Sequence, residues 1–469
     1  MDQVLTVDFG STYTKAALFD LRQKELIGSG YAPSTVDTDI TVGLRAALRE
    51  ISSITDIGDV TSLVSSSAAG GLRVATIGLV PSLSLEAAQR AALGAGAKIV
   101  SSVGFKVTAK DIDTIRNSRP DIILLAGGID GGDEETILHN AEALSKSPLE
   151  VPIIVAGNKV VASDCIQLLA EEGKTVTLAD NIFPEIDRLE VGPVHEVIRE
   201  LFMNRITHAK RIDHVSGTLN LAKPIIPTPK GVLDAAQLLS EGTDDEPGMG
   251  TLVIVDIGGA TTDVHSAAHG SPTKSGVIQR GLPEFFLKRT VEGDLGMRVN
   301  AETLLERVGT PNIARLAGIA SGKDGPPAER EITDYIQDIS RRPERVPRNM
   351  RETTIEAALG RAAVHLAVSR HAGTLREVFT TSGAVWVQEG KDLSVVCTVI
   401  GVGGVLTQGR HPRYVLEGAL ENSESPFSLM PQQPALYIDA AYVLFGIGLL
   451  AGLFPTEALR LAKKYLLSV

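Results

Sequence analysis

Two stretches of sequence decide the fold, VDFGSTYTK at Val7–Lys15 and VIVDIGGATTDV at Val253–Val264. In each, an apolar strand ends in an aspartate, glycine follows, and Ser or Thr residues come next. A strand that stops at an Asp-x-Gly turn lifts its carboxylate out of the sheet and leaves backbone N–H groups able to face an anion. Two such hairpins in one chain predict two lobes, each offering a phosphate-binding loop to one nucleotide.

The hairpins are neither P-loops nor strand-to-helix dinucleotide fingerprints, because the residues after each loop, 15–20 and 262–267, continue as another strand. Their hydroxyl groups can reach phosphate oxygens, and Lys15 can supply a point charge. The candidate nucleotide-binding residues of the two loops are Asp8, Gly10, Ser11, Thr12, Lys15, Gly258, Gly259, Thr261 and Thr262.

This arrangement resembles the ATPase superfamily of actin, sugar kinases and heat-shock chaperones, whose members share five sequence stations. The resemblance implies an α/β fold with two ribonuclease-H-like lobes and an adenosine motif whose glycines, here Gly401, Gly403 and Gly404, pass close to adenine and ribose. Ser382-Gly383-Ala384 is the alternative for that motif. The five candidate stations are Val7–Lys15, the first connecting helix from Pro227 to Leu239, Asp256–Asp263, Val399–Val405 and a second connecting helix at Ile438–Gly452.

Four further runs resemble a family within that superfamily, the MutL-type accessory protein of coenzyme-B12-dependent glutamate (methylaspartate) mutase. This family is unrelated to the DNA mismatch-repair protein of similar name. The resemblance implies an ATPase that reactivates or protects a cobalamin-dependent mutase, with ATP and Mg²⁺ as cofactors and mutase subunits as partners; a homodimer is left open. The runs are SSSAAGGLRVATIGLVPSL (Ser65–Leu83), RAALGAGAKIV (Arg90–Val100), RPDIILLAGGIDGG (Arg119–Gly132) and IVDIGGATTDVHS (Ile254–Ser266).

Asp8 and Asp256, one in each hairpin, are the expected metal-binding pair, because magnesium is usually held through one or two carboxylates plus phosphate oxygens. The alternative is a purely structural role, in which each carboxylate only caps its turn by accepting local N–H groups. Hydrolysis also needs a group that orients water. Heat-shock chaperones have a Glu just before the Pro-Thr of the connecting helix, where this chain has Ile226. Asp263 and Thr228 are the weaker candidates, so we expect slow hydrolysis.

Two other functions compete with the mutase-associated ATPase. A small-molecule kinase or ATP-dependent hydrolase needs a carboxylate that deprotonates a substrate, for which Asp130 and Asp133 can be proposed. A non-hydrolysing scaffold that nucleotide switches would need no such base. The Arg73–Gly132 segment vaguely echoes cobalamin-binding domains, but it lacks the histidine that would ligate cobalt, so we expect no direct ligation.

Composition narrows the class of protein. The 469 residues suffice for two or three domains, and 43% hydrophobic with 22% charged residues is ordinary for a soluble protein. A net charge of −12 argues against sequence-independent nucleic-acid binding. The two cysteines, Cys165 and Cys397, form no Cys-x-x-Cys pair, which excludes a zinc ribbon or the paired-cysteine iron–sulfur site of radical-dehydratase activators.

Neither end of the chain suggests a membrane. The first ten residues lack the regions of a signal peptide. The apolar run Ala440–Phe454 is shorter than the roughly 20 residues that span a bilayer. We expect it to form a buried helix of a cytoplasmic protein.

Regular strand–helix alternation begins near Leu72 and predicts a five-stranded, flavodoxin-like parallel module inserted in the first lobe. We expect this module to move with the first phosphate loop and to dock on a mutase subunit. The segments Glu241–Gly250, Gly322–Arg348 and Arg341–Arg351 are interpreted as surface loops. The expected domains are residues 1–71 (first lobe), 72–204 (inserted module), 205–250 (rest of the first lobe and connecting helix), 251–434 (second lobe) and 435–469 (second connecting helix, returning to the first lobe).

Overall fold

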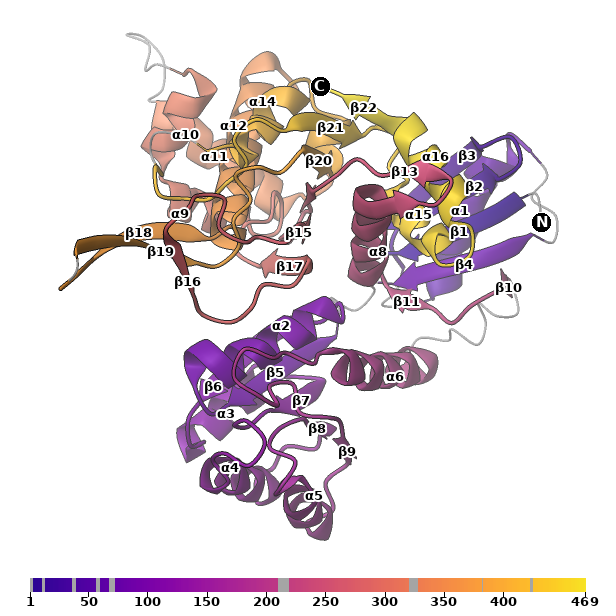
Figure 1. The fold of residues 1–469 in the computed structure, drawn as a ribbon. Coiled ribbons are helices and arrows are strands. Elements are labelled where there is room, and N and C mark those ends of the chain that lie inside the picture. Colours follow the sequence, from indigo (N-terminus) through magenta and orange to yellow (C-terminus); the bar gives the residue numbers. More distant parts are fainter. Residues whose placement is uncertain are drawn as a thin grey trace. The chain divides into compact units, whose positions relative to one another are not determined.

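The computed structural model describes residues 3–10, 13–35, 39–55, 60–66, 72–209, 219–319, 328–381, 383–421 and 425–469. The chain divides into two compact units. Figure 1 shows its helices and strands. The first unit comprises Met1–Gly231 with Gly281–Pro283, and the second comprises Val232–Arg280 with Glu284–Val469.

The first unit contains a sheet whose first three strands form an antiparallel meander. The fourth strand pairs parallel to the first, and two short strands pair parallel to the fourth. The strand order is therefore β3-β2-β1-β4, with β10 and β11 beyond β4. The helix α1 packs on β2 and β3. The elements are β1 (Gln3–Phe9), β2 (Tyr13–Asp20), β3 (Glu25–Pro33), α1 (Ile40–Ser52), β4 (Thr61–Ser66), β10 (Asn220–Leu221) and β11 (Ile226–Pro227).

The second sheet of the first unit is the predicted inserted module. All five strands are parallel, in the order β6-β5-β7-β8-β9, which is the flavodoxin-like order. The elements are β5 (Arg73–Gly78), a π-helical turn η1 (Pro81–Leu85), α2 (Glu86–Gly94), β6 (Lys98–Gly104), α3 (Ala109–Asn117), β7 (Ile122–Leu125), α4 (Glu135–Ser145), β8 (Ile153–Val155), α5 (Ala162–Glu171), β9 (Val176–Leu178) and α6 (Gly192–Ala209).

Helices cover both faces of this parallel sheet. Ile122 and Leu124 of β7 belong to the hydrophobic cluster that includes residues of α2 and α6. The alternating residues Ile123 and Leu125 belong to the cluster formed with α3, α4 and α5. Because successive side chains of a strand point to opposite faces, the continuous apolar run fills two cores at once.

The central sheet of the second unit repeats the topology of the first. It too begins with a three-stranded antiparallel meander, after which β20 pairs parallel to β14 and β21 parallel to β20. The order is β17-β15-β14-β20-β21, and β22 adds an antiparallel edge. The strands are β14 (Leu252–Ile257), β15 (Thr262–Ala267), β17 (Leu287–Glu292), β20 (Thr398–Val402), β21 (Ala435–Asp439) and β22 (Leu466–Ser468).

Helices pack around α12 to form the core of the second unit, together with one side of its central sheet. A separate three-stranded sheet, β16-β19-β18, extends away from that core (Figure 1). The helices with residues in this core are α9 (Ala301–Val308), α10 (Thr310–Ala317), α11 (Ala328–Arg341), α12 (Met350–His371), α13 (Gly404–Thr407) and α14 (Pro412–Leu416). The other helices are α8 (Thr228–Glu241), α15 (Leu444–Ala451) and α16 (Pro455–Tyr465), of which α15 packs on α16. The remaining elements are β12 (Gly242–Thr243), β13 (Glu246–Pro247), β16 (Val277–Arg280), β18 (Thr374–Thr380), β19 (Gly383–Glu389) and a short 3₁₀ turn, η2 (Glu417–Ala419).

The predicted fold class is confirmed by this topology. The two hairpins lie in separate sheets of the same strand order, and the inserted module is a parallel sheet covered on both faces. The domain limits at residues 71, 204, 250 and 434 stay a prediction.

Three segments interpreted as loops are more ordered than expected. The described part of 322–348 contains α11, whose Ile332, Ile336 and Ile339 are fully buried in the core. Arg345, in the basic cluster, has a side chain only 9% exposed and paired with Asp338 and Glu352. The 241–250 segment contains the β12–β13 hairpin, tied to α16 by ion pairs of Glu246 with Arg460 and Lys463.

The second predicted connecting helix also starts later than expected. Ile438 and Asp439 complete β21, and the helix α15 begins at Leu444. Asp439 causes this separation, because its carboxylate accepts the N–H groups of Val443 and Leu444 at 3.0 and 2.8 Å. Within the described ranges, no helix combines the length and the apolarity that a bilayer-spanning segment requires.

Candidate functional site

Asp8 is held inside the first unit at the carboxyl end of β1. Its side chain is 2% exposed, and one carboxylate oxygen accepts hydrogen bonds from Ser65 Oγ at 2.9 Å and from Thr228 Oγ1. The other oxygen lies 4.0 Å from Lys15 Nζ. Ser65 is the neighbour of Asp8 on the parallel strand β4, and Thr228 starts α8 directly after β11. The ends of three parallel strands therefore converge on this carboxylate.

The first phosphate loop is a tight turn. Gly10 N–H donates to Tyr13 O at 3.0 Å, and a Cβ at Gly10 would lie 2.5 Å from that oxygen, so only glycine fits without a shift. Lys15, directly opposite Asp8 on β2, has a side chain 26% exposed, so its ammonium can face a ligand. Ser11 and Thr12, predicted for phosphate binding, lie outside the described residues.

The second hairpin has the same turn. Gly258 N–H donates to Thr261 O at 2.9 Å. The difference lies across the strands, where Asp256 is directly opposite Asp263, so two carboxylates are cross-strand neighbours. Arg289 of β17, 6% exposed, compensates one of them through Nη2, 2.7 Å from Asp263 Oδ2.

The carbonyl groups of the second loop are turned toward the segment 296–300. The carbonyl of Gly258 accepts from Met297 N–H at 3.1 Å, and that of Gly259 accepts from Arg298 N–H at 2.8 Å. The carbonyl of Ala260 accepts from Asn300 Nδ2 at 2.7 Å. Within the described part of the second unit, the N–H groups of Gly259 and Ala260 donate no backbone hydrogen bond. They are the donors that an anion needs.

The structure separates the two threonines that the sequence left equivalent. Thr262 is fully buried, and its hydroxyl donates to Leu295 O at 2.7 Å. Thr261 is half-buried at the tip of the turn. Its hydroxyl is therefore better placed for a phosphate oxygen than that of Thr262, which serves the packing of the hairpin.

The predicted adenosine motif lies at the end of β20, beside the second hairpin. Gly403 has φ +115°, and a Cβ there would lie 2.3 Å from Ile257 O, so glycine permits the close approach of β20 to the end of β14. Gly401 is inside the strand, where a Cβ would meet Leu406 Cδ1 at 2.6 Å, which explains that glycine by packing. Gly404 is exposed, and a Cβ there would meet nothing within 4 Å.

The alternative adenosine motif has a different setting. Ser382 lies outside the described residues, and Gly383 and Ala384 are exposed at the start of β19. No glycine-to-helix turn follows them within the described part of β19. The segment at Val399–Val405 is therefore the better candidate.

The carboxylates considered for a kinase are already engaged. Partial burial acts to raise the pKa of Asp130, but the hydrogen bond from Asn181 and the charge of Lys159 outweigh it and lower that pKa below its ordinary value. Asp133 accepts Thr136 N–H at 3.0 Å at the start of α4. A lowered pKa and a capping role both disfavour a general base.

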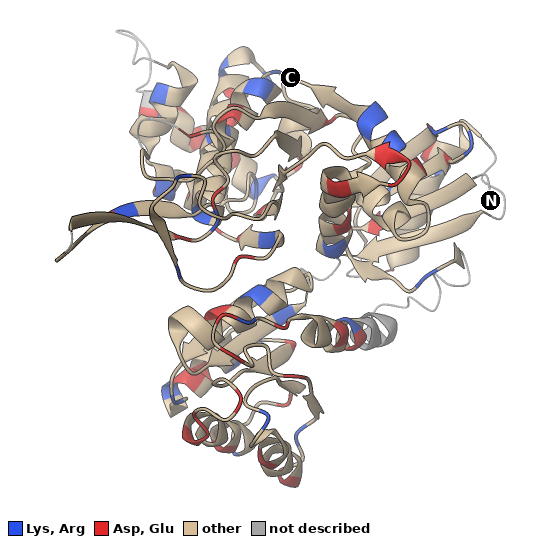
Figure 2. Ribbon diagram, viewed as in Figure 1, with Lys and Arg blue, Asp and Glu red and all other residues tan. Residues whose placement is uncertain are grey.

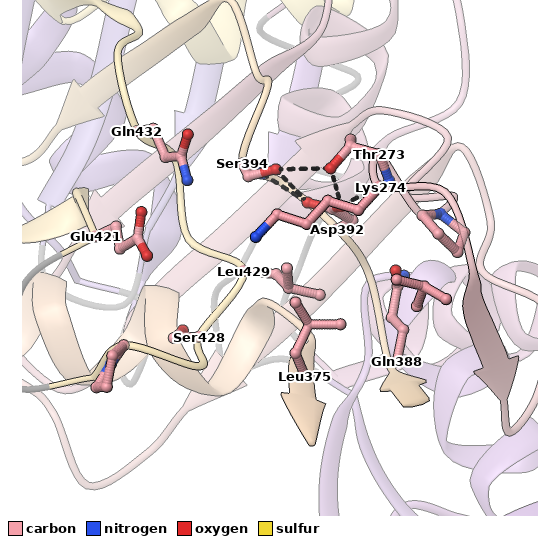
Figure 3. Close-up of a pocket in the computed structure, with 13 residues that line it drawn as sticks. Thr273, Lys274, Leu375, Gln388, Asp392, Ser394, Glu421, Ser428, Leu429 and Gln432 are labelled. Carbon is pink, nitrogen blue, oxygen red and sulfur yellow. Dashed lines mark hydrogen bonds between the residues drawn. The ribbon is translucent and has the colours of Figure 1, made fainter. Parts of the chain in front are cut away.

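A small pocket lies elsewhere, at the base of the three-stranded sheet of the second unit (Figure 3). Asp392 accepts hydrogen bonds there from Thr273 Oγ1 at 2.8 Å and Ser394 Oγ at 2.6 Å. The pocket has a volume of about 30 Å³, which suits water rather than a nucleotide. Among the described residues, no group of three or more His, Cys, Asp and Glu forms a metal-binding cluster.

Sequence reasoning missed Ser65 and Arg289. The serines that end the fourth strand, Ser65 and Ser66, were a signal for Ser65, because their strand runs parallel to β1. Arg289 had no such signal, since only the register of β15 with β17 brings it to Asp263.

The chain is similar to proteins of known family. It is 40% identical to "Protein MutL" of Clostridium tetanomorphum over 479 residues, covering all of both chains. Solved structures share less: a ROK family glucokinase from Streptomyces griseus is 10% identical, with 98% of this chain and 99% of that chain covered, and a glycerol dehydratase reactivase is also 10% identical, with 96% and 99% covered. Their TM-scores of 0.31 support no conclusion. The model of the family described as MutL protein matches residues 4–466, and the chain belongs to that family.

Proposed function

We propose that this chain is a nucleotide-dependent accessory protein of an adenosylcobalamin-dependent mutase of the glutamate (methylaspartate) type. We choose a mutase as the partner because the chain belongs to the MutL family. The main observation in support of nucleotide binding is the duplicated sheet, which puts an aspartate and a glycine turn at the same place in each hairpin. Slow ATP hydrolysis and movement of the lobes would drive release of damaged cofactor.

The residues fit Mg-ATP by their chemistry. Asp8 and Asp256 would hold a magnesium ion through its waters, and the ion would supply positive charge against that of the phosphates. Lys15, Thr261 and the N–H groups of Gly259 and Ala260 would bind phosphates. Gly403 and Gly404 would lie against adenosine.

The candidates for orienting water are already bound within the chain. The hydroxyl of Thr228 donates to Asp8, and Asp263 is paired with Arg289. This engagement favours slow hydrolysis and supports, as the second candidate function, a nucleotide-switched scaffold that does not hydrolyse ATP. A small-molecule kinase is disfavoured by the engagement of Asp130 and Asp133.

Two measurements test the proposal. Calorimetric titration of the full chain with ATP, with and without Mg²⁺, should show binding that magnesium strengthens. Mutase inactivated by bound cyanocobalamin should then regain turnover when this chain, ATP, Mg²⁺ and adenosylcobalamin are added. Reactivation with ATP but not with a non-hydrolysable analogue supports the ATPase, and equal reactivation with both supports the scaffold. No ATP binding, or turnover of ATP that depends on a small substrate, would overturn the proposal.

A further inference from the structure

The inserted module displays apolar side chains along one edge of its parallel sheet. Leu83, Phe105, Val160 and Ile186 follow the carboxyl ends of β5, β6, β8 and β9, and are 37%, 60%, 55% and 69% exposed. Because all five strands are parallel, these loops share one edge, which is where open α/β sheets bind their ligands. We call the loops 79–85, 105–108, 126–135, 156–161 and 179–191 the carboxyl edge.

Phe105 is held in an unfavourable backbone conformation with its ring largely exposed. Its φ is +67°, where a bulky residue is a genuine outlier. Asn140, 1% exposed, fixes the loop by donating to Phe105 O at 3.0 Å and accepting Val107 N–H at 2.8 Å. Strain of this kind persists where the surroundings over-determine it and is concentrated at functional positions.

Ile186 repeats the pattern at the far strand of the sheet. It lies in a turn closed by the hydrogen bond from Arg188 N–H to Glu185 O at 3.1 Å, followed by Asp187 with φ +70°. Turn apices usually carry polar residues or glycine. A 69% exposed isoleucine there gains nothing from the core of this chain.

The carboxyl edge is strongly acidic. Its five loops contain eight Asp and Glu residues against three Lys and Arg, a formal charge of −5 (Figure 2). Each of the three cations is in an ion pair within the edge: Lys106 with Glu135, Lys159 with Asp130, and Arg188 with Glu185 and Glu190. Acidic groups in excess of these pairs therefore surround the apolar side chains.

The crevice in which a small ligand would sit is closed by the chain itself. Asn181 Nδ2 donates to Gly128 O at 3.1 Å, so the loops after β9 and β7 are in contact. Asp130 Oδ1 accepts from Asn181 Nδ2 at 2.8 Å and from Lys159 N–H at 3.0 Å. The polar groups of the crevice bind one another, which leaves the exposed apolar side chains for a macromolecule.

We propose that the carboxyl edge is the surface on which a mutase subunit docks, through a complementary face of that subunit that carries an apolar centre ringed by Lys and Arg. Apolar contacts would supply the affinity, and opposite charges would supply rate and register. The identity of the partner rests on the proposed function, whereas the place and the chemistry of the surface rest on the exposed residues and charges of the edge.

Variants of the full-length chain test the surface by bio-layer interferometry against each purified subunit of the mutase from the same organism. Phe105→Asn removes the ring yet suits a positive φ, so the fold should be kept while the dissociation constant rises about tenfold or more. Ile186→Ser should act in the same direction. Glu134→Lys with Asp180→Lys should weaken binding and flatten its dependence on salt.

Matched controls lie away from the edge. Glu171→Lys with Glu172→Lys makes the same charge change at the end of α5, and Phe379→Asn removes an 80% exposed ring from β18. Both should bind like the wild type, and all variants should keep Mg-ATP affinity. Binding by Phe105→Asn and Ile186→Ser equal to wild type would overturn the docking surface alone. Wild-type chain that binds ATP but neither subunit would overturn both this inference and the proposed partner.

Discussion

The two hairpins share their turn, their register and their place in a sheet, yet differ in the residue opposite the aspartate. Asp8 faces Lys15, so the first hairpin carries its own cation. Asp256 faces Asp263, so the second carries two carboxylates, of which Arg289 compensates one. One fold thus builds two hairpins with opposite charge across the strand from their first aspartate.

The largest effect is expected from removing Arg289, the cation of β17 that pairs with Asp263 of the second hairpin. Removal of Lys15 from the first hairpin is the comparison. Arg289→Met leaves the Asp263 carboxylate partly buried without its partner, which should lower the free energy of unfolding of the second unit by about 3 kcal/mol. Lys15→Met should cost less than about 1 kcal/mol, because that ammonium is partly exposed and 4.0 Å from Asp8. Hydrogen exchange of each unit, followed by mass spectrometry, measures both changes. Equal losses would mean that the two pairs do not differ in kind.

Removing the charge of Asp256 tests the metal-binding role proposed for that residue. Asp256→Asn keeps the shape of the side chain and removes one of two adjacent carboxylates, so Mg-ATP should bind about 10–100-fold more weakly. Affinity for ATP without Mg²⁺ should change little. Calorimetry with and without Mg²⁺ measures both, with Glu302→Gln on α9 as a control for loss of charge. An unchanged effect of magnesium would remove Asp256 from the metal site.

Acid should loosen the second unit more than the first, because it contains two strongly shifted histidines. Burial, then Arg289, lowers the pKa of His265 to about 3, and burial, then Lys288 and Lys391, lowers the pKa of His371 well below its ordinary value. In the first unit, burial and Lys230 lower the pKa of His195 to about 4.

The direction in which pH changes the free energy of unfolding follows from proton uptake by these histidines. The unfolded chain binds protons near pH 6.5, whereas these histidines stay neutral in the folded chain at pH 5, so stability present above pH 6.5 is lost as the pH falls. His265 alone should cost the second unit about 2 kcal/mol between pH 7 and pH 5. Hydrogen exchange at both pH values should show a smaller pH effect in His265→Gln. A variant with the full pH effect would exclude His265 as its source.

A smaller effect than that of Arg289→Met is expected at the hydroxyls that hold Asp8. Thr228→Val and Ser65→Ala each remove one donor to the same carboxylate, so each should cost the first unit about 1.5 kcal/mol. Because its hydroxyl is engaged by Asp8, Thr228→Val should slow ATP hydrolysis no more than Ser65→Ala does, as steady-state phosphate release would show. Loss of hydrolysis in Thr228→Val alone would make Thr228 the water-orienting residue.

Local patterns predicted the strands and helices closely. In the inserted module, the strand–helix alternation predicted from Leu72 onward is present as five parallel strands with helices between them. α11 was missed, since its apolar residues at 332, 336 and 339 stand four and three apart among many charges near prolines and glycines. Because of these charges the segment was interpreted as a surface loop. Only the packing of α11 in the core shows that one face of the helix is apolar and buried.

The two Asp-Gly hairpins, the strand–helix alternation of the module and the family can be recognised from the amino-acid sequence, because they depend on residues close together in the chain. Tertiary structure decided which residues meet the aspartates. Register between strands far apart in sequence puts Ser65 beside Asp8, Asp263 opposite Asp256, and Arg289 next to Asp263. Hydrogen-bond pairing fixes such registers only once the whole sheet is assembled, and a shift of one residue would turn each side chain to the other face.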